Sequence, residues 1–387
     1  MASTTHPARW DIFCSVVDNY GDIGVAWRLA RQLAAEHRLD VRLYIDALAA
    51  LSRIAPEVDA SAGRQSVLGV DVRAWDRWRD ARLADDDMGQ VVVEAFGCGL
   101  APGYVAAMSS RTPLPVWINL EYLTAEGWIE GYHGLPSPQA RGPLTRYFYF
   151  PGFTAASGGL LRELGLFARR DVFRADNAAR AKLWRTLQIA PPPVDALAVS
   201  LFCYADAPVA QLFDAWSAGD SAVCCLIPES VANTAVKQWA GRNLRSGEAH
   251  RRGALMLLPV PFVAQDDYDR LLWSCDLNFV RGEDSFVRAQ WAARPLLWQP
   301  YRQSEDAHLG KLEAFLGRHS AGLSPDAGTV FAAFNRGWCT GSIEPSQWDA
   351  VAAAYPELSA RADAWAADLA AQDDLAARLV NFAFDRV

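Results

Sequence analysis

Residues 277–291 read LNFVRGEDSFVRAQW, and this stretch changes character twice within a short span. The apolar run at 277–280 predicts a buried strand, the polar run at 281–285 a tight loop, and the pattern from Phe286 onward a helix. A strand that stops at a loop and continues as a helix is the unit from which parallel α/β sheets are built. The stretch therefore predicts an α/β fold.

The loop in this stretch carries side chains suited to a diphosphate. The first turn of a helix leaves backbone N–H groups unpaired and carries about half a positive charge. Arg281 and Arg288 add guanidinium groups for bidentate phosphate contacts, and Glu283 adds an acceptor for a sugar or ribose hydroxyl. Asp284 or Ser285 is expected to cap the helix. A capped helix with surface ion pairs remains the simpler alternative.

A second loop, DNYGDIG at 18–24, separates an expected strand from an expected helix near the start of the chain. Asp18 and Asp22 stand beside glycines, so a tight turn can direct both carboxylates to the C-terminal edge of a sheet, where α/β folds place their sites. The dinucleotide fingerprint GxGxxG is absent, because only GxxG occurs. A turn-forming role for Asp18 and a helix N-cap role for Asp22 stay open.

Short β-like runs alternate with helical segments along the chain, as in parallel sheets covered on both faces. The expected strands are 11–17, 40–46, 67–75, 90–96, 115–120 and 147–153 in the first half, and 196–204, 221–228, 254–263, 276–282 and 295–300 in the second. A chain of 387 residues exceeds one typical core, so two domains are expected.

Three consecutive prolines at 191–193 cannot continue the preceding helix and predict a stiff linker. We therefore expect an N-terminal domain at 1–190 and a second domain at 191–365. The last segment, 366–387, has apolar positions at helical spacing, so it is expected to pack as a helix against a domain.

Charge and cysteine content exclude several classes of protein. The net charge of −8 argues against a general nucleic-acid binder, which needs a basic surface. The seven cysteines form no CxxC pair and no cluster with histidine at metal-binding spacing, so no metal site is expected. No signal-peptide core or membrane-spanning apolar run occurs. These features predict a cytoplasmic protein without a membrane partner.

The two loops and their surroundings resemble one family, EarP, the bacterial arginine rhamnosyltransferases that glycosylate elongation factor P. The resemblance covers nearly the whole chain. It includes DNYGDIGVAWRLARQL at 18–33, WINLEYLTAEGWIE at 117–130, HGLPSP at 133–138, YFYFPGFTAASGGLLRE at 147–163, LFCYADAP at 201–208, LLWSCDLNFVRGEDSFVRAQWAARPLLWQPYRQ at 271–303 and AHLGKLEAFL at 307–316.

This resemblance implies a GT-B fold, in which two Rossmann-like domains face a cleft and a C-terminal helix returns to the first. It implies transfer of L-rhamnose from dTDP-β-L-rhamnose to an arginine of elongation factor P with inversion, in support of translation of polyproline stretches. Asp22 would then be the general base or activating acid group and Asp18 its support, both in the acceptor-binding first domain. Glu283 would act at the ribose and diphosphate of the donor, held by the second domain.

The same resemblance assigns further contacts to the substrates. Phe202, Tyr204, Phe262 and Gln265 would form the thymine pocket, with rings for stacking and an amide for the base edge. Packing in the core is the alternative for these four. Arg281, Asp284, Ser285 and Arg288 would bind the donor as well, and Asn19, Tyr20 and Gly21 would line the substrate site of the first loop. No cofactor or metal is expected.

Other functions remain open. A nucleotide-sugar epimerase on the same two-domain plan would need no protein acceptor, and a non-catalytic partner of elongation factor P would only sense the dTDP-sugar. A nicotinamide enzyme is disfavoured by the missing third glycine. Glu121, Tyr122 and His133 lie in motif-rich loops that can meet the sugar or the acceptor.

Overall fold

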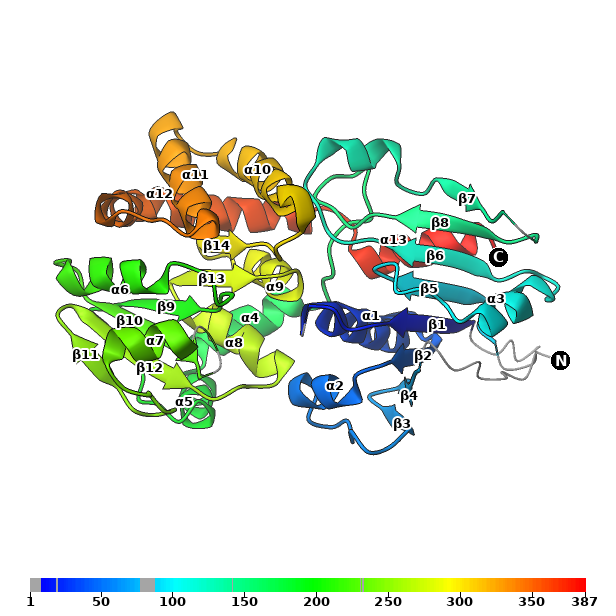
Figure 1. Cartoon of the computed structure of the whole chain (residues 1–387), viewed down its shortest axis with the longest axis horizontal. Coiled ribbons are helices and arrows are strands. Elements are labelled where there is room, and N and C mark those ends of the chain that lie inside the picture. Colours follow the sequence, from blue (N-terminus) through cyan, green and yellow to red (C-terminus); the bar gives the residue numbers. More distant parts are fainter. Residues whose placement is uncertain (1–7, 19, 77–87, 141, 230, 232) are drawn as a thin grey trace. The chain divides into compact units, whose positions relative to one another are not determined.

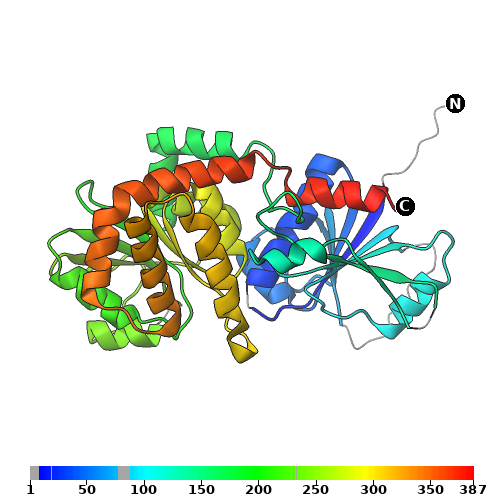
Figure 2. The same cartoon turned by 90° about the horizontal axis from the view of Figure 1, so that it is seen from above.

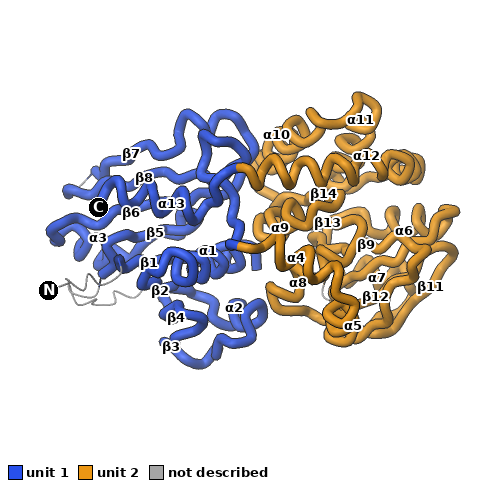
Figure 3. Tube along the Cα trace, turned by 180° about the vertical axis from the view of Figure 1, so that it is seen from behind, with its two compact units in different colours: residues 1–164, 372–387 blue, residues 165–371 orange. Residues whose placement is uncertain are grey.

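The computed structural model describes residues 8–18, 20–76, 88–140, 142–229, 231 and 233–387. The chain divides into two compact units, which are residues 1–164 with 372–387 (unit 1) and residues 165–371 (unit 2), coloured blue and orange in Figure 3. In each unit a mainly parallel sheet packs between helices (Figure 1), so the expected α/β class is confirmed.

Unit 1 is built on an eight-stranded sheet in the order β3-β4-β2-β1-β5-β6-β8-β7. The pairs from β4 to β8 are parallel, whereas β3 and β7 pair antiparallel at the two edges. The inner strands β1 and β5 are almost entirely buried, because helices cover both of their faces. The bounds are β1 Arg9–Cys14, β2 Asp40–Ile45, β3 Arg64–Val67, β4 Val70–Ala74, β5 Val91–Ala95, β6 Val116–Leu120, β7 Pro136–Pro138 and β8 Thr145–Tyr149.

Several expected strands of unit 1 differ from the observed bounds at their ends, and the expected strand 67–75 is wrong because it contains a turn. The run 67–75 was expected to be continuous, but the chain reverses at Leu68 and Gly69, and β3 and β4 form an antiparallel hairpin. Both turn residues have positive φ, 51° and 83°, as a two-residue hairpin turn requires. The turn was not predicted because Leu68 is apolar and extends the apolar run of the two strands.

Unit 2 contains a six-stranded sheet in the order β11-β12-β10-β9-β13-β14. Only the short edge strand β11 is antiparallel to its neighbour among these pairs. The bounds are β9 Leu197–Leu201, β10 Val223–Pro228, β11 His250–Arg252, β12 Leu255–Val260, β13 Leu277–Arg281 and β14 Leu296–Gln299. The strand and the helix expected within 277–291 are therefore both present, as β13 and α9.

The helices follow the strands in the alternation that the sequence predicts. Unit 1 has α1 Gly21–His37, α2 Leu48–Ile54, α3 Pro102–Ser109, the 3₁₀ turn η2 Gly127–Gly131 and α13 Leu375–Phe384. Unit 2 has α4 Leu166–Ala175, α5 Asn177–Thr186, α6 Val209–Ala218, α7 Asn233–Ala240, α8 Gln265–Ser274, α9 Asp284–Ala292, the 3₁₀ turn η3 Ser304–Asp306, α10 Ala307–Ser320, α11 Pro325–Thr340 and α12 Pro345–Ala370. None of the helices in the described part combines the length and hydrophobicity of a membrane span.

The division into units falls between residues 164 and 165 rather than at the prolines 191–193. Helix α4 belongs to unit 2 because its arginines bind the C-terminal ends of two unit 2 helices. Arg170 donates to the carbonyl of Trp291 at 2.9 Å, and Arg174 donates to those of Trp273 and Ala292. Cations are favoured there by the helix dipole and the unpaired carbonyls. The prolines are thus internal to unit 2.

The C-terminal segment is shared between the two units. Helix α12 packs against α11 within unit 2, as Figure 2 shows, and Trp365 donates to the Gln290 side chain at 2.7 Å. Residues 372–387 belong to unit 1, where α13 packs against α1. Gln32 donates to the Asp374 carboxylate at 3.1 Å. The segment assigned to unit 1 therefore starts at residue 372, six residues after the expected start at 366.

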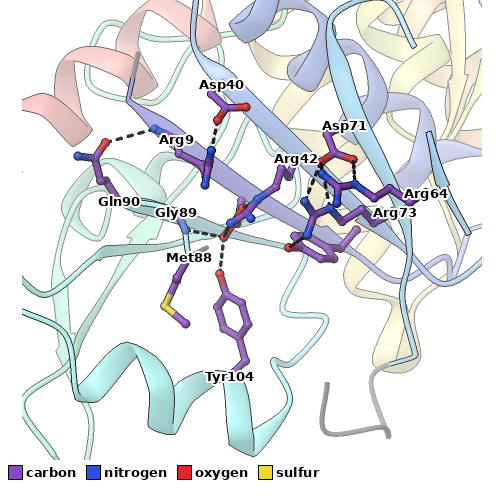
Figure 4. A network of polar contacts seen from close by, with 12 residues as sticks. Arg9, Asp40, Arg42, Arg64, Asp71, Arg73, Met88, Gly89, Gln90 and Tyr104 are labelled. Carbon is purple, nitrogen blue, oxygen red and sulfur yellow. Dashed lines mark hydrogen bonds and ion pairs between the residues drawn. The ribbon is translucent and has the colours of Figure 1, made fainter. Parts of the chain in front are cut away.

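A buried charge network joins three elements of unit 1 (Figure 4). The guanidinium of Arg42 donates to both oxygens of the Asp11 carboxylate, at 2.5 and 2.7 Å. The Tyr104 hydroxyl and the Gly89 backbone N–H also donate to Asp11, at 2.6 and 2.7 Å. Both charged side chains are buried, so the pairing and the extra donors offset the cost of removing them from water.

Candidate functional site

The turn after β1 brings the two predicted aspartates together in unit 1. Asp18 and Asp22 are 8% and 2% exposed. The Asp22 carboxylate accepts hydrogen bonds from the backbone N–H groups of Val17 and Asp18, both at 2.8 Å. Gly21 leaves room for the Asp18 side chain, because a Cβ at position 21 would lie 2.8 Å from an Asp18 carboxylate oxygen. The two acids thus form one compact arrangement.

Asp22 does not cap helix α1, whereas Asp18 does form part of a turn. Tyr20 is the N-cap of α1 and Asp22 lies inside the first turn, so the N-cap interpretation of Asp22 is wrong. Asp18 does take part in a turn, since its carbonyl accepts from the Gly21 N–H at 2.7 Å. Asn19 lies outside the described residues, and Tyr20 is half-buried with its carbonyl bound by the Gly24 N–H.

A third carboxylate, which the sequence did not single out, holds the first half of the same loop. Asp46 directly follows β2 and accepts hydrogen bonds from the Ser15 hydroxyl and, at 3.0 Å, from the Val16 N–H. Strand β2 lies next to β1 in the sheet, with Cys14 opposite Ile45. The residues after the two strands are therefore neighbours in space, although they are distant in sequence.

The surroundings of Asp22 raise the pKa of its carboxyl above the usual value. Burial is the main cause, and the charge of Asp46 adds to it. Hydrogen bonds from the N–H groups of Asp18 and Val17 and from the Tyr122 side chain act in the opposite direction. A held carboxylate with a raised pKa has the properties of a general base.

The ends of β5 and β6 contribute the aromatic residue that contacts Asp22. Tyr122 stacks on Phe96, with ring centroids 4.5 Å apart and an interplanar angle of 18°. Phe96 has a positive φ of 58°, which is uncommon for a non-glycine residue. The adjacent Glu121 carboxylate accepts from the Asn119 amide at 2.5 Å. Asp22, Asp46 and Glu121 thus follow strands that end at the same edge of the unit 1 sheet.

In unit 2 the predicted loop between β13 and α9 forms a tight turn. Gly282 has a φ of 60°, and its carbonyl accepts from the Trp298 indole at 2.8 Å. Glu283 is the N-cap of α9 and makes no side-chain capping bond. The expectation that Asp284 or Ser285 caps the helix is therefore wrong. The Ser285 hydroxyl bonds to the Arg281 backbone carbonyl, and the Asp284 carboxylate accepts from Gln265 at 3.1 Å.

Arg281 lies between two aromatic residues of the neighbouring strand end. Its guanidinium carbon is 4.3 Å from the Phe202 ring centroid and 4.6 Å from that of Tyr204. One guanidinium nitrogen also donates to the Cys203 carbonyl at 2.9 Å. Two of the three rings expected to bind thymine, those of Phe202 and Tyr204, therefore have an arginine against them, and the arrangement holds Arg281 beside the start of α9.

The Arg288 side chain binds a buried carboxylate, although it was predicted to contact phosphate. It is 2% exposed and donates to both oxygens of the Asp269 carboxylate, at 2.6 and 3.0 Å. This buried bidentate pair joins α9 to α8 and gives Arg288 a packing role in place of the expected phosphate contact. The other two members of the predicted base pocket, Gln265 and Phe262, are buried and half-buried at the start of α8.

A pocket of about 260 Å³ lies beside Tyr204 in unit 2. Its polar wall is linked, because Gln299 accepts from the Tyr204 N–H at 2.8 Å and donates to the Asp206 carboxylate at 3.0 Å. Tyr301 meets Tyr204 edge to face, with centroids 5.7 Å apart. Asp206, Gln299 and Tyr301 are not among the residues expected to form a site. The signal that could have found them is their place near the C-terminal ends of two strands: Gln299 is the last residue of β14, Tyr301 follows it by two residues, and Asp206 lies in the loop after β9.

Comparisons with known proteins identify the family to which the chain is similar. Residues 10–384 match the model of the family described as elongation-factor P (EF-P) rhamnosyltransferase EarP. The chain is 50% identical to a protein-arginine rhamnosyltransferase of Pseudomonas putida, over 97% of this chain and 98% of that one. A counterpart from Pseudomonas aeruginosa is 48% identical, over 98% and 99%.

Solved structures of glycosyltransferases resemble this chain in fold. One described as "Structural basis for EarP-mediated arginine glycosylation of translation elongation factor EF-P" has a TM-score of 0.68 and 37% identity, covering 98% of this chain and 100% of that one. The spinosyn rhamnosyltransferase SpnG, complexed with thymidine diphosphate, has a TM-score of 0.51 at 14% identity, covering 97% and 99%, and so supports the fold alone. The expected GT-B class is confirmed. The chain belongs to the family of elongation-factor P rhamnosyltransferases, and it is a glycosyltransferase.

Proposed function

We propose that this enzyme transfers L-rhamnose from dTDP-β-L-rhamnose to an arginine side chain of elongation factor P, with inversion at the anomeric carbon. The observation that carries the chemistry is the Asp22 carboxylate, buried and fixed by two backbone N–H groups in the turn after β1. The names of the related proteins support arginine and elongation factor P as the acceptor.

On the acceptor side, a guanidinium is a poor nucleophile because its charge is delocalised and its pKa exceeds 12. A carboxylate that accepts two of its N–H groups orients the side chain and can remove a proton as attack proceeds. We assign this role to Asp22, with Asp18 beside it to hold the remaining positive charge. Unit 1 is therefore the proposed acceptor-binding unit.

On the donor side, the leaving group is a nucleoside diphosphate, which gains negative charge as the bond to the sugar breaks. The N-terminus of α9 and the guanidinium of Arg281 supply positive charge for it. Glu283 and Asp284 stand at the same helix start as acceptors for hydroxyl groups of the donor. Phe202, Tyr204, Phe262 and Gln265 are proposed to hold the base.

The transfer is proposed as a single displacement. The arginine nitrogen attacks the anomeric carbon, the bond between that carbon and the diphosphate oxygen breaks, and the nitrogen's proton goes to Asp22. The products are rhamnosylated arginine and dTDP, and one displacement inverts a β-linked donor to an α-linked product. We propose that no metal is needed, because the helix start and Arg281 stabilise the leaving group, so activity should survive chelation by EDTA.

Mass spectrometry of elongation factor P after incubation with the enzyme and dTDP-L-rhamnose tests the proposal. A deoxyhexose increment on one arginine is the expected result, and NMR of the product should show the α anomer. An unmodified acceptor, with a changed free sugar nucleotide in solution, would favour an epimerase instead.

A further inference from the structure

The loop that carries the aspartates is held by two carboxylates rather than one. Four consecutive residues of the loop each donate a hydrogen bond to a carboxylate. The Ser15 hydroxyl and the Val16 N–H donate to Asp46, and the Val17 and Asp18 N–H groups donate to Asp22. Asp46 thus fixes the first half of the loop, and Asp22 fixes the second.

The backbone of Asp46 is fixed by the sheet, so its carboxylate can hold the neighbouring loop in place. It directly follows β2, a strand paired on both sides in the sheet, and Ser15 directly follows the adjacent strand β1. Asp46 precedes Ala47, the N-cap of helix α2, and α2 has no side-chain capping bond. The Asp46 carboxylate is bound by the neighbouring loop.

We propose that Asp46 is a positioning residue for the transfer reaction, which sets the orientation of Asp22 and Asp18 by fixing residues 15–16. The inference rests on the proposed role of Asp22 as the base. Asp46 does not touch the reacting atoms in this scheme and acts through the loop. A loop held at one half only would let the two acids drift from the acceptor nitrogen.

Three variants separate the contributions. Asp46→Ala removes both hydrogen bonds and is expected to lower kcat by up to about a hundredfold, the scale of a small misplacement of a catalytic group. Ser15→Ala removes one bond without changing charge and should lose less. Asp46→Asn keeps an oxygen for the Val16 N–H and should recover most of kcat. The KM for elongation factor P and the affinity for dTDP should stay close to wild type.

Asp40→Ala is the matched control. Asp40 begins the strand that Asp46 follows, so it is a carboxylate at the opposite end of β2, and it pairs with Arg9 at 2.6 Å. This variant should turn over like wild type. If Asp46→Ala and Ser15→Ala both match Asp40→Ala in kcat, the proposal is overturned.

Hydrogen exchange of the peptide containing residues 15–22 provides a readout that needs no activity. Asp46→Ala should speed exchange of the Val17 and Asp18 amides, whereas Asp40→Ala should not. Unchanged exchange would count against the inference even if kcat fell. A wild-type enzyme that leaves elongation factor P unmodified would sink the proposed function, while the exchange result would still decide whether Asp46 orders the loop.

Discussion

The carboxylate of Asp22 accepts a 2.8 Å hydrogen bond from the backbone N–H of Asp18, so the two acids of the turn are held in a fixed relation. Asn at position 22 keeps an oxygen for this bond but cannot take a proton from an arginine. Asp22→Asn should therefore lower kcat by about 100-fold to 10,000-fold, the usual range for loss of a general base. The measurement is the rate of rhamnosylation of elongation factor P. Affinity for dTDP, measured by calorimetry, should be unchanged, and a variant with full activity would refute the base assignment.

The raised pKa of Asp22 predicts a pH dependence. The base must be ionised to act, so the rate should fall as the pH drops through the pKa of Asp22, which lies above the ordinary value of 3.8. The Tyr122 side chain lowers this pKa by its hydrogen bond. Tyr122→Phe should therefore move the acidic limb of the kcat/KM profile to higher pH. A limb that stays in place, or moves to lower pH, would contradict this role of Tyr122.

Two arginines, one at the end of β13 and one in α9, should respond differently to substitution. Arg281→Met should weaken dTDP binding by about tenfold to a hundredfold, since hydrogen bonds to charged groups contribute about 1.5–3 kcal/mol. Arg288→Met should instead lower the stability of unit 2, because it leaves the Asp269 carboxylate without its buried bidentate partner. Calorimetry with dTDP and thermal unfolding distinguish the two. Equal loss of dTDP affinity in both variants would restore the phosphate role predicted for Arg288.

The network around Asp11 predicts a large effect on stability far from the substrate residues. Arg42→Met leaves a buried carboxylate without its cation, which costs about 3–5 kcal/mol. Arg9→Met is the matched control in the same unit, because its 2.6 Å pair with Asp40 is 38% and 36% exposed, and such pairs contribute about 1 kcal/mol or less. Hydrogen exchange of peptides from β1 and β2 reports the stability of unit 1. Similar losses in the two variants would contradict the argument.

The pattern of apolar residues along the chain was enough to predict most of the strands and helices of the α/β fold. The strand, loop and helix at 277–291 were predictable because apolar period and loop chemistry are encoded within a few neighbouring residues. The turn at residues 68 and 69 was missed because Leu68 adopts a positive φ at a position where hairpin turns usually carry asparagine, aspartate or glycine.

Partners brought together by strand order could not be predicted in the same way. Asp46 reaches the aspartate loop only because β2 lies beside β1, and Arg281 meets Phe202 only because β13 lies beside β9. The pairing of Arg288 with Asp269 depends likewise on how α9 packs against α8. Residue type predicted a charged role for Arg288 and gave no indication of which charge it would meet.

If the donor binds as proposed, the arginine held between Phe202 and Tyr204 also affects the thermodynamics of its binding. A free arginine side chain has about 2 kcal/mol of rotamer entropy to lose when a ligand immobilises it. In this fold two rings and the Cys203 carbonyl have already restricted those torsions. A nucleotide bound at Arg281, as proposed, would therefore meet a preorganised cation, and little of its binding enthalpy would be cancelled by ordering that side chain.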